Sequence, residues 1–176
     1  MILEELSRLI AVKIKKLDPD GPGSLEVLAY GIGLKLNLYT GILLTVLLGA
    51  LISDVLHSLL ALAAFMALRK FSGGFHLPIT ICTLVTGLGA AIIPLIRMNQ
   101  GQVIVLTLLS VFLVLLFAPN NYEDINLVEF DSWSKWISAA IALSNLFIQS
   151  SVVASAFIFQ CLLLLPIYPR KGGDQA

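Results

Sequence analysis

Apolar residues fill the chain in long stretches that short polar breaks separate. In residues 1–17 the apolar positions recur every three or four residues opposite basic ones, which predicts an amphipathic helix. The apolar positions are Ile2, Leu3, Leu6, Leu9, Ile10, Ile14 and Leu17, and the basic ones are Arg8, Lys13, Lys15 and Lys16. Two interpretations stay open: the helix lies in a membrane interface with its basic face toward lipid headgroups, or it packs on the protein's own membrane domain.

Beyond residue 23, the distances between charged residues indicate membrane-spanning helices. One crossing needs about 20 mainly apolar residues. The first predicted span is 36–53, and the alternative is a start as early as 25. The next three predicted spans are 55–71, 78–96 and 103–118. The run 136–169 is too long for one crossing, so it should fold back as a fifth and a sixth helix. The polar residues expected at this turn are Ser144, Asn145, Gln149, Ser150 and Ser151.

The predicted fold is an all-α integral membrane protein with about six transmembrane helices after an amphipathic interfacial helix. Residues 1–23 form that helix and its linker, and residues 24–176 form the transmembrane domain, with cytoplasmic loops near 69–78 and 119–135. In this arrangement every lysine and arginine except Arg97 falls on the side of the N-terminus. The positive-inside rule then predicts a multi-pass protein of the cell membrane with both termini in the cytoplasm.

Composition supports the membrane and excludes several other classes of protein. The 176 residues are 58% apolar and 12% charged, with a mean hydropathy of +0.94, whereas soluble chains are about 45–50% apolar and about 25% charged. A net charge of zero argues against a nucleic-acid partner, and two distant cysteines argue against a disulfide scaffold. We predict no cofactor and no metal site, because the two histidines fall on opposite sides of the predicted topology.

Candidate chemistry is concentrated at the cytoplasmic edge of the third predicted helix. His76 and Cys82 lie close together there, after a flexible Gly73-Gly74 pair. A thiol attacks as its thiolate, and a neighbouring imidazole is a common activator. With Pro78 in the first helical turn, Cys82 lies about one turn inside the positive end of the helix dipole. Candidate oxyanion donors are the N–H groups of the 78–81 turn and the residues Thr80 and Thr83.

Spacing alone leaves a second interpretation open. On a continuous helix a residue six positions away points about 120° to the side, so His76 must lie outside the helix to meet Cys82. Otherwise the pair is a small buried cysteine and an interfacial histidine.

The run Arg-x-x-Ser-Gly-Gly-x-His, followed shortly by cysteine, resembles the accessory gene regulator B family of quorum-sensing peptide processors, which are membrane cysteine endopeptidases. Segments 30–36 and 117–120 add to the likeness. The resemblance implies that His76 and Cys82 form a catalytic dyad that cleaves a propeptide through a thioester and closes a thiolactone or lactone ring. It also implies supporting roles for Arg69, Ser72, Gly73 and Gly74. The family usually has seven residues from histidine to cysteine, and this chain has six.

Other polar positions carry weaker hypotheses. The acidic residues Glu123, Asp124, Glu129 and Asp131 form either a solvated loop or a docking site for a basic amphipathic part of the propeptide. Cys161 is predicted to be structural, and His57 near Asp54 is predicted to be an interfacial cap. The segment 87–91 indicates close helix packing, with a dimer interface as the alternative. The expected partners are thus the propeptide, the bilayer and a second copy of the chain.

Two other functions compete with the peptidase. In a small transporter or substrate-binding membrane subunit, polar helix positions would line a path, and the candidates are Ser144, Asn145, Gln149 and Gln160. In a scaffold, the chain would hold the propeptide for another protease.

Overall fold

The computed structural model describes residues 1–75, 77–120 and 133–166. In these ranges the chain is all-helical, with seven α-helices, one 3₁₀ turn and no strand, as the sequence predicts. The helices are α1 (Ile2–Leu17), α2 (Leu25–Ile52), α3 (Val55–Ser72), α4 (Ile79–Ile92), α5 (Gln100–Phe117), α6 (Trp133–Ile148) and α7 (Ser151–Leu162), and the 3₁₀ turn η1 (Ile93–Leu95) follows α4.

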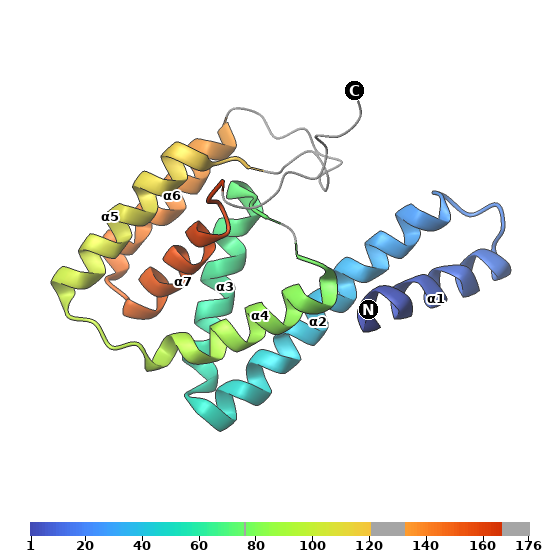
Figure 1. Ribbon diagram of the computed structural model, residues 1–176, viewed down its shortest axis with the longest axis horizontal. Coiled ribbons are helices and arrows are strands. Elements are labelled where there is room, and N and C mark those ends of the chain that lie inside the picture. Colours follow the sequence, from blue (N-terminus) through green and yellow to red (C-terminus); the bar gives the residue numbers. More distant parts are fainter. Residues whose placement is uncertain (76, 121–132, 167–176) are drawn as a thin grey trace.

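Helix α3 lies between two groups of helices (Figure 1). On one side it contacts α2 and α4, and on the other it contacts α6 and α7, which pack with α5. The larger buried cluster joins α3 to the second group and includes Leu68, Val114, Ala142 and Phe157. Helix α1 lies along the first part of α2 and also touches α4. The last turn of α3 and the first turns of α4 face a common cavity, which Arg69 and Cys82 both line.

Small residues allow α2 and α4 to approach each other closely. The buried positions of α2 recur every four or eight residues at Gly33, Gly41, Thr45 and Gly49, and those of α4 include Thr83, Gly87 and Ala91. A Cβ on Gly87 would lie 2.7 Å from the Leu44 side chain, and one on Gly89 would lie 3.0 Å from the Phe159 ring. These contacts confirm close helix packing within one chain at residues 87–91. A dimer interface stays a prediction.

Three helices, α2, α3 and α5, are long and apolar enough to cross a membrane. Large apolar side chains on them face outward, with Leu51 82%, Val105 62% and Phe112 57% exposed. Large apolar side chains exposed at this many positions of long apolar helices support association with a membrane. Helices α4, α6 and α7 have 14, 16 and 12 residues, so the predicted count of six crossings does not follow from their lengths.

Helix α1 combines features of the two interpretations offered for it. Ser7 and Ala11 are buried where α1 packs on its neighbours, while Ile2 (76%) and Leu9 (68%) stay exposed. The helix is thus packed on the protein's own domain and still presents apolar side chains outward.

Several predicted helix boundaries are wrong by a few residues, and two of them have a clear physical reason. Helix α5 begins at Gln100 rather than 103, because Asn99 and Gln102 form a reciprocal capping box with two 2.9 Å hydrogen bonds. Helix α4 ends at Ile92 and tightens into the 3₁₀ turn that contains Pro94, instead of continuing to 96.

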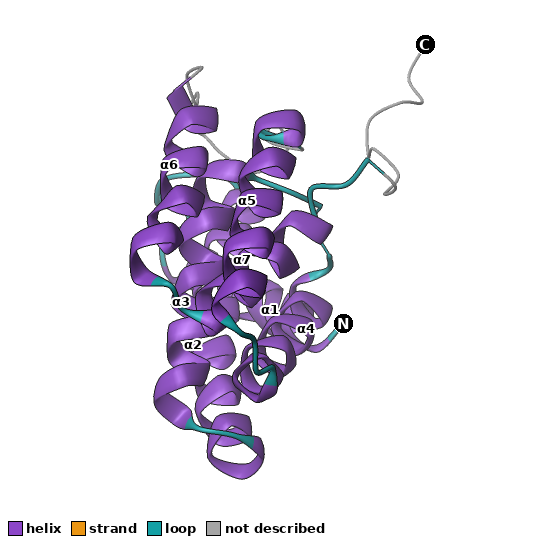
Figure 2. Cartoon of the chain, turned by 90° about the vertical axis from the view of Figure 1, so that its left-hand side faces the viewer, coloured by secondary structure: helices purple, strands orange, loops and turns teal. Residues whose placement is uncertain are grey.

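The predicted fold-back of the last apolar run is present as the hairpin of α6 and α7, beside α5 (Figure 2). Asn145, fully buried, holds its turn from both sides. The Asn145 Oδ1 accepts from the Ser150 N–H at 3.1 Å, and Nδ2 donates to the Ser150 carbonyl at 3.2 Å and to the Thr107 hydroxyl at 2.9 Å. Asn145 therefore closes the hairpin and fastens it to α5.

Candidate functional site

Cys82 lies one turn into α4, where its backbone N–H donates to the Pro78 carbonyl at 2.8 Å. The helix begins only at Ile79, so Phe75 and Leu77 both lie before it. The Cys82 thiol is partly buried, and its sulfur lies 4.0 Å from the Thr86 hydroxyl. It borders a cavity rather than the packed core.

That cavity measures about 110 Å³ and lies between α2, α3 and α4. Most of its wall is apolar, and Asn37, Thr83, Thr86 and Arg69 add polar groups; the apolar residues are Leu38, Gly41, Ile42, Leu62, Phe65 and Met66. Among the described residues that line it, Arg69 alone carries a charge. The structure therefore brings the predicted nucleophile and the predicted supporting arginine to one cavity.

Arg69 is held in place by three neighbours. Its Nη2 donates to the Phe75 carbonyl at 3.0 Å, and its Nη1 is 3.4 Å from Gln160 Oε1. The guanidinium also lies over the Phe65 ring, 5.6 Å from the centroid. Phe75 immediately precedes position 76 in the chain. The hydrogen bond from Arg69 therefore holds the residue before position 76 near the cavity that Cys82 lines.

The segment 72–75 is fixed rather than flexible, which corrects the expectation for the glycine pair. The Gln160 Nε2 donates to the Gly73 carbonyl at 2.6 Å and to the Ser72 hydroxyl at 3.1 Å. The Gly74 N–H donates to the Asn120 carbonyl at 2.8 Å, and the Asn120 N–H donates to the Ser72 carbonyl at 3.2 Å. The Phe75 N–H donates to the Leu163 carbonyl at 2.8 Å. Two distant parts of the chain, the end of α7 and Asn120, thus hold this segment.

Both glycines of the pair are required by backbone geometry. Gly73 has φ of +70° and Gly74 has φ of +127°, values that side chains disfavour. A Cβ on Gly74 would also lie 3.2 Å from both Gln160 Nε2 and the Leu163 carbonyl oxygen. Gly73-Gly74 therefore allows the chain to turn sharply against α7.

His76 lies outside the described residues, as do the acidic positions Glu123, Asp124, Glu129 and Asp131. The dyad and the acidic docking site stay predictions.

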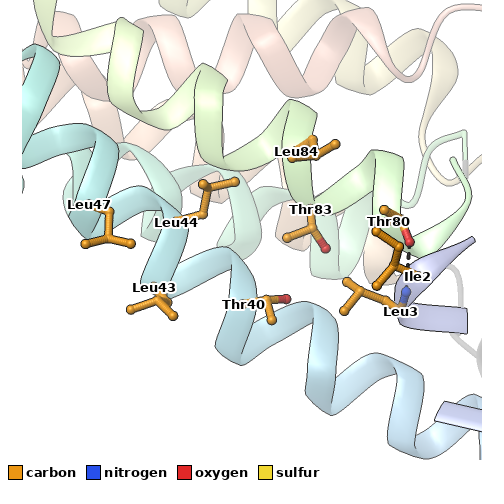
Figure 3. Close-up of a pocket in the computed structure, with 9 residues that line it drawn as sticks. All are labelled: Ile2, Leu3, Thr40, Leu43, Leu44, Leu47, Thr80, Thr83 and Leu84. Carbon is orange, nitrogen blue, oxygen red and sulfur yellow. Dashed lines mark hydrogen bonds between the residues drawn. The ribbon is translucent and has the colours of Figure 1, made fainter. Parts of the chain in front are cut away.

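The start of α4 is capped by a residue from α1. Pro78 at the N-cap supplies no side-chain hydrogen bond. Instead, the Glu4 carboxylate accepts from the Thr80 N–H at 3.1 Å and from its hydroxyl at 2.6 Å. The Leu3 N–H donates to the Thr80 hydroxyl at 3.1 Å (Figure 3). Desolvation by itself would raise the pKa of Glu4, but the hydrogen bonds from Thr80 and from backbone N–H groups, together with the N-terminal charge, lower this pKa.

This capping changes the list of candidate oxyanion donors. The Thr80 N–H and hydroxyl are both engaged by Glu4, so the prediction that Thr80 serves as a donor to a substrate is wrong for this conformation. The Thr83 hydroxyl lies 2.9 Å from the Ile79 carbonyl and 2.5 Å from Asn37 Oδ1, so it too is engaged.

A second, more open depression lies on the other side of this helix start. It is almost entirely apolar, measures about 280 Å³ and is bounded by α1, α2 and α4 (Figure 3). Its lining residues are Ile2, Leu3, Thr40, Leu43, Leu44, Leu47, Thr80, Thr83 and Leu84. The first turns of α4 therefore separate the cavity of Cys82 from an apolar groove.

Sequence reasoning missed three amide side chains that organise the site. Gln160 is fully buried and binds Ser72 and Gly73, Asn120 Nδ2 donates to the Leu164 carbonyl at 3.0 Å, and Asn37 lines the Cys82 cavity. The available signal was a strong polar group in or beside an apolar run. Asn145 lies at the hairpin turn, as predicted, and in the structure both Asn145 and Gln160, which the transporter hypothesis places along a path, form hydrogen bonds within the protein.

Cys161 and His57 lie in the structural positions that the sequence predicts for them. Cys161 is fully buried, with its sulfur 3.6 Å from the Ser110 carbonyl. His57 is exposed at the start of α3, where Asp54 accepts from its N–H at 2.8 Å and lies 2.6 Å from its Nδ1. The hydrogen bonds from His57 hold the pKa of Asp54 below its usual value.

A family model described as Accessory gene regulator B matches residues 7–168, which include the whole 69–82 segment. The chain belongs to the accessory gene regulator B family. Membership in this membrane family implies a role in accessory gene regulator peptide maturation. No curated protein and no solved structure matches the chain.

Proposed function

We propose that this member of the accessory gene regulator B family is a membrane cysteine endopeptidase that cleaves a signalling propeptide and cyclises one of the products. One observation carries the proposal: Cys82 and Arg69 line the same cavity, and Arg69 binds the carbonyl of Phe75, the residue before His76. The shared cavity of Cys82 and Arg69 and the hydrogen bond to Phe75 support a site in which His76, the next residue in the chain, acts with Cys82.

In the first step, the Cys82 thiolate attacks the scissile carbonyl carbon, and the C–N bond breaks. His76 takes the thiol proton and gives it to the leaving amine. The N-terminal part of the propeptide stays on Cys82 as a thioester. The positive charge of Arg69 in the same cavity attracts the negative charge that develops on sulfur and on the carbonyl oxygen.

In the second step, a thiol or hydroxyl of the bound peptide attacks the thioester carbonyl. The S–C bond to Cys82 breaks, a thiolactone or lactone ring closes, and the proton of the attacking group returns to the Cys82 sulfur through His76. Water competes with this attack and would release a linear product. The apolar side chains around Cys82, including Leu62 and Phe65, support cyclisation because they exclude solvent.

Co-expression with a candidate propeptide tests the proposal. Cys82→Ser and His76→Ala should each abolish cleavage, while Cys161→Ser, which alters a cysteine in the core, should retain it. Mass spectrometry of the product should give a mass lower than that of the linear fragment by one water. Cleavage by Cys82→Ser at the rate of the parent protein would refute the peptidase function and favour the scaffold or transporter interpretation.

We also propose six crossings by α2 to α7 with α1 at the inner interface and both termini in the cytoplasm. The uneven distribution of basic residues and the exposed apolar side chains of α1 support this arrangement. Single cysteines introduced at position 20 and at position 98 should react with a membrane-impermeant reagent from opposite sides in intact cells and inverted vesicles.

The acidic segment is proposed to dock a basic amphipathic part of the propeptide. Its residues, Glu123, Asp124, Glu129 and Asp131, lie close in sequence to Asn120, which is bound to the 72–75 segment. Reversal of the four charges should weaken capture of the propeptide in a pull-down, and undiminished capture would dismiss this role.

A further inference from the structure

The cavity beside Cys82 also offers a basis for substrate selection. We infer that it is the pocket for an apolar side chain of the propeptide, on the residue whose carbonyl becomes the thioester, and that Gly41 keeps this pocket open. The inference rests on the proposed function, because it assigns a role to the space around the Cys82 sulfur.

Covalent geometry connects the pocket to that residue. When an acyl group is attached to the Cys82 sulfur, its Cα is bonded to the thioester carbon, so its side chain must occupy space near the sulfur. The space that the structure shows beside Cys82 is the cavity of about 110 Å³. An apolar cavity of about 150 Å³ holds one benzene molecule. The pocket therefore suits a medium-sized aliphatic side chain.

The chemistry of the wall favours an apolar occupant over an acidic one. Five of the lining side chains are aliphatic, aromatic or thioether groups: Leu38, Ile42, Leu62, Phe65 and Met66. The one charged group, Arg69, already donates to the Phe75 carbonyl and covers the Phe65 ring. An acidic side chain in this cavity would lose its hydration and face mainly apolar atoms. The Arg69 guanidinium would compensate only in part, because it already donates to the Phe75 carbonyl.

Gly41 differs from the other buried glycines of α2. A Cβ on Gly33 would lie 2.6 Å from Ile79 Cδ1, and one on Gly49 would lie 2.8 Å from the Ser58 hydroxyl. A Cβ on Gly41 would meet no heavy atom of the described residues within 4 Å. Helix packing thus requires glycine at positions 33 and 49. At Gly41, in contrast, the missing side chain leaves room in the cavity that Cys82 lines.

Reaction of Cys82 with alkyl methanethiosulfonates measures the pocket without any substrate. The thiolate attacks the sulfenyl sulfur, a disulfide forms and methanesulfinate leaves. In a Cys161→Ser background, the rate constant should rise at least fivefold from the methyl to the butyl reagent. Gly41→Leu should reduce the butyl rate about tenfold or more and leave the methyl rate within about threefold.

The matched control is Gly31→Leu, on the same helix. Gly31 is exposed, and a Cβ there meets none of the described heavy atoms within 4 Å, so the change adds the same side chain outside the cavity. This variant should show the parent rates with both reagents. Equal butyl rates in Gly41→Leu and Gly31→Leu would overturn the inference. Faster reaction of the anionic sulfonatoethyl reagent than of the butyl reagent would overturn the assignment of an apolar occupant.

Cleavage assays then separate this inference from the proposed function. In a propeptide that the parent protein cleaves, leucine on the N-terminal side of the scissile bond should be preferred to alanine about tenfold in kcat/KM, and Gly41→Leu should remove that preference. If Cys82→Ser is inactive and Gly41→Leu keeps the preference, the pocket assignment fails and the peptidase stands. If Cys82→Ser still cleaves, the proposed function itself fails.

Discussion

The Glu4 carboxylate accepts hydrogen bonds from both the backbone N–H and the hydroxyl of Thr80, a residue 76 positions later in the chain. Glu4 thereby supplies α4 with the N-terminal cap that Pro78 does not provide. Thr80 is two residues before Cys82, so the N-terminal helix holds the helix turn that carries the candidate nucleophile.

Glu4→Gln should lower the stability of the folded protein. Loss of a side-chain cap costs about 1 kcal/mol, and the amide still offers one oxygen, so a shift of a few degrees in the midpoint of thermal unfolding is expected in detergent. Glu5→Gln is the matched control, because the Glu5 carboxylate is 80% exposed and lies 3.9 Å from the N-terminal amine. Equal midpoints for the two variants would contradict the capping role.

The stabilisation by Glu4 should depend on pH. Its pKa in the folded protein is below the ordinary value of 4.5, so the folded state favours the ionised carboxylate. The contribution of Glu4 to stability is complete at pH values above its pKa in the unfolded state. It is lost as the pH falls through its pKa in the folded state. The difference in unfolding midpoint between the parent and Glu4→Gln should therefore be full at about pH 7 and small at about pH 3. A difference in unfolding midpoint that increases as the pH falls would contradict this prediction.

Gln160→Leu should release the segment that precedes position 76. The substitution removes the donors to Gly73 and Ser72 and leaves a buried carbonyl and hydroxyl with one partner fewer, at a cost of about 1–3 kcal/mol. Amide hydrogen exchange at 73–75 should become at least tenfold faster, and cleavage should fall. Gln100→Leu, at an exposed glutamine bound to Gln149, should change neither measurement.

Gly74→Ala should impair the site more than an ordinary glycine substitution does. The residue has φ of +127°, and its Cβ would press on Gln160 and on the Leu163 carbonyl. We expect a loss of cleavage of at least tenfold with the protein still inserted in the membrane. Gly101→Ala, in the first turn of α5, meets only the Asn99 side chain at 3.4 Å and should be active. An active Gly74→Ala protein would show that the turn tolerates a side chain.

Asn145→Ala should open the hairpin of α6 and α7. It removes three hydrogen bonds around the turn, including the one to Thr107 on α5, so a loss of about 2–3 kcal/mol in unfolding free energy is expected. Ser144→Ala, which removes only a hydrogen bond to the Ile141 carbonyl of its own helix, is the control. Equal denaturation curves for these two variants would contradict the role of Asn145.

Local sequence alone determined the helices. Apolar runs bounded by proline, glycine and polar residues predicted every helix from α1 to α7, because helix formation depends on periodicity and on bonds between residues four positions apart. It also determined that the last run must turn back, since one straight helix of that length would exceed a bilayer. The motif around Cys82 was visible because its residues are close in sequence.

Only the tertiary structure decided which distant groups complete the site. Four residues from separate segments, Glu4, Asn37, Asn120 and Gln160, each form hydrogen bonds with the 72–83 region across 46 to 88 positions of the chain. Such contacts leave no periodic pattern in the chain, because they depend on how helices cross rather than on how each helix forms. The same reason explains why the rigidity of Gly73-Gly74 and the open space at Gly41 appeared only after the helices were packed.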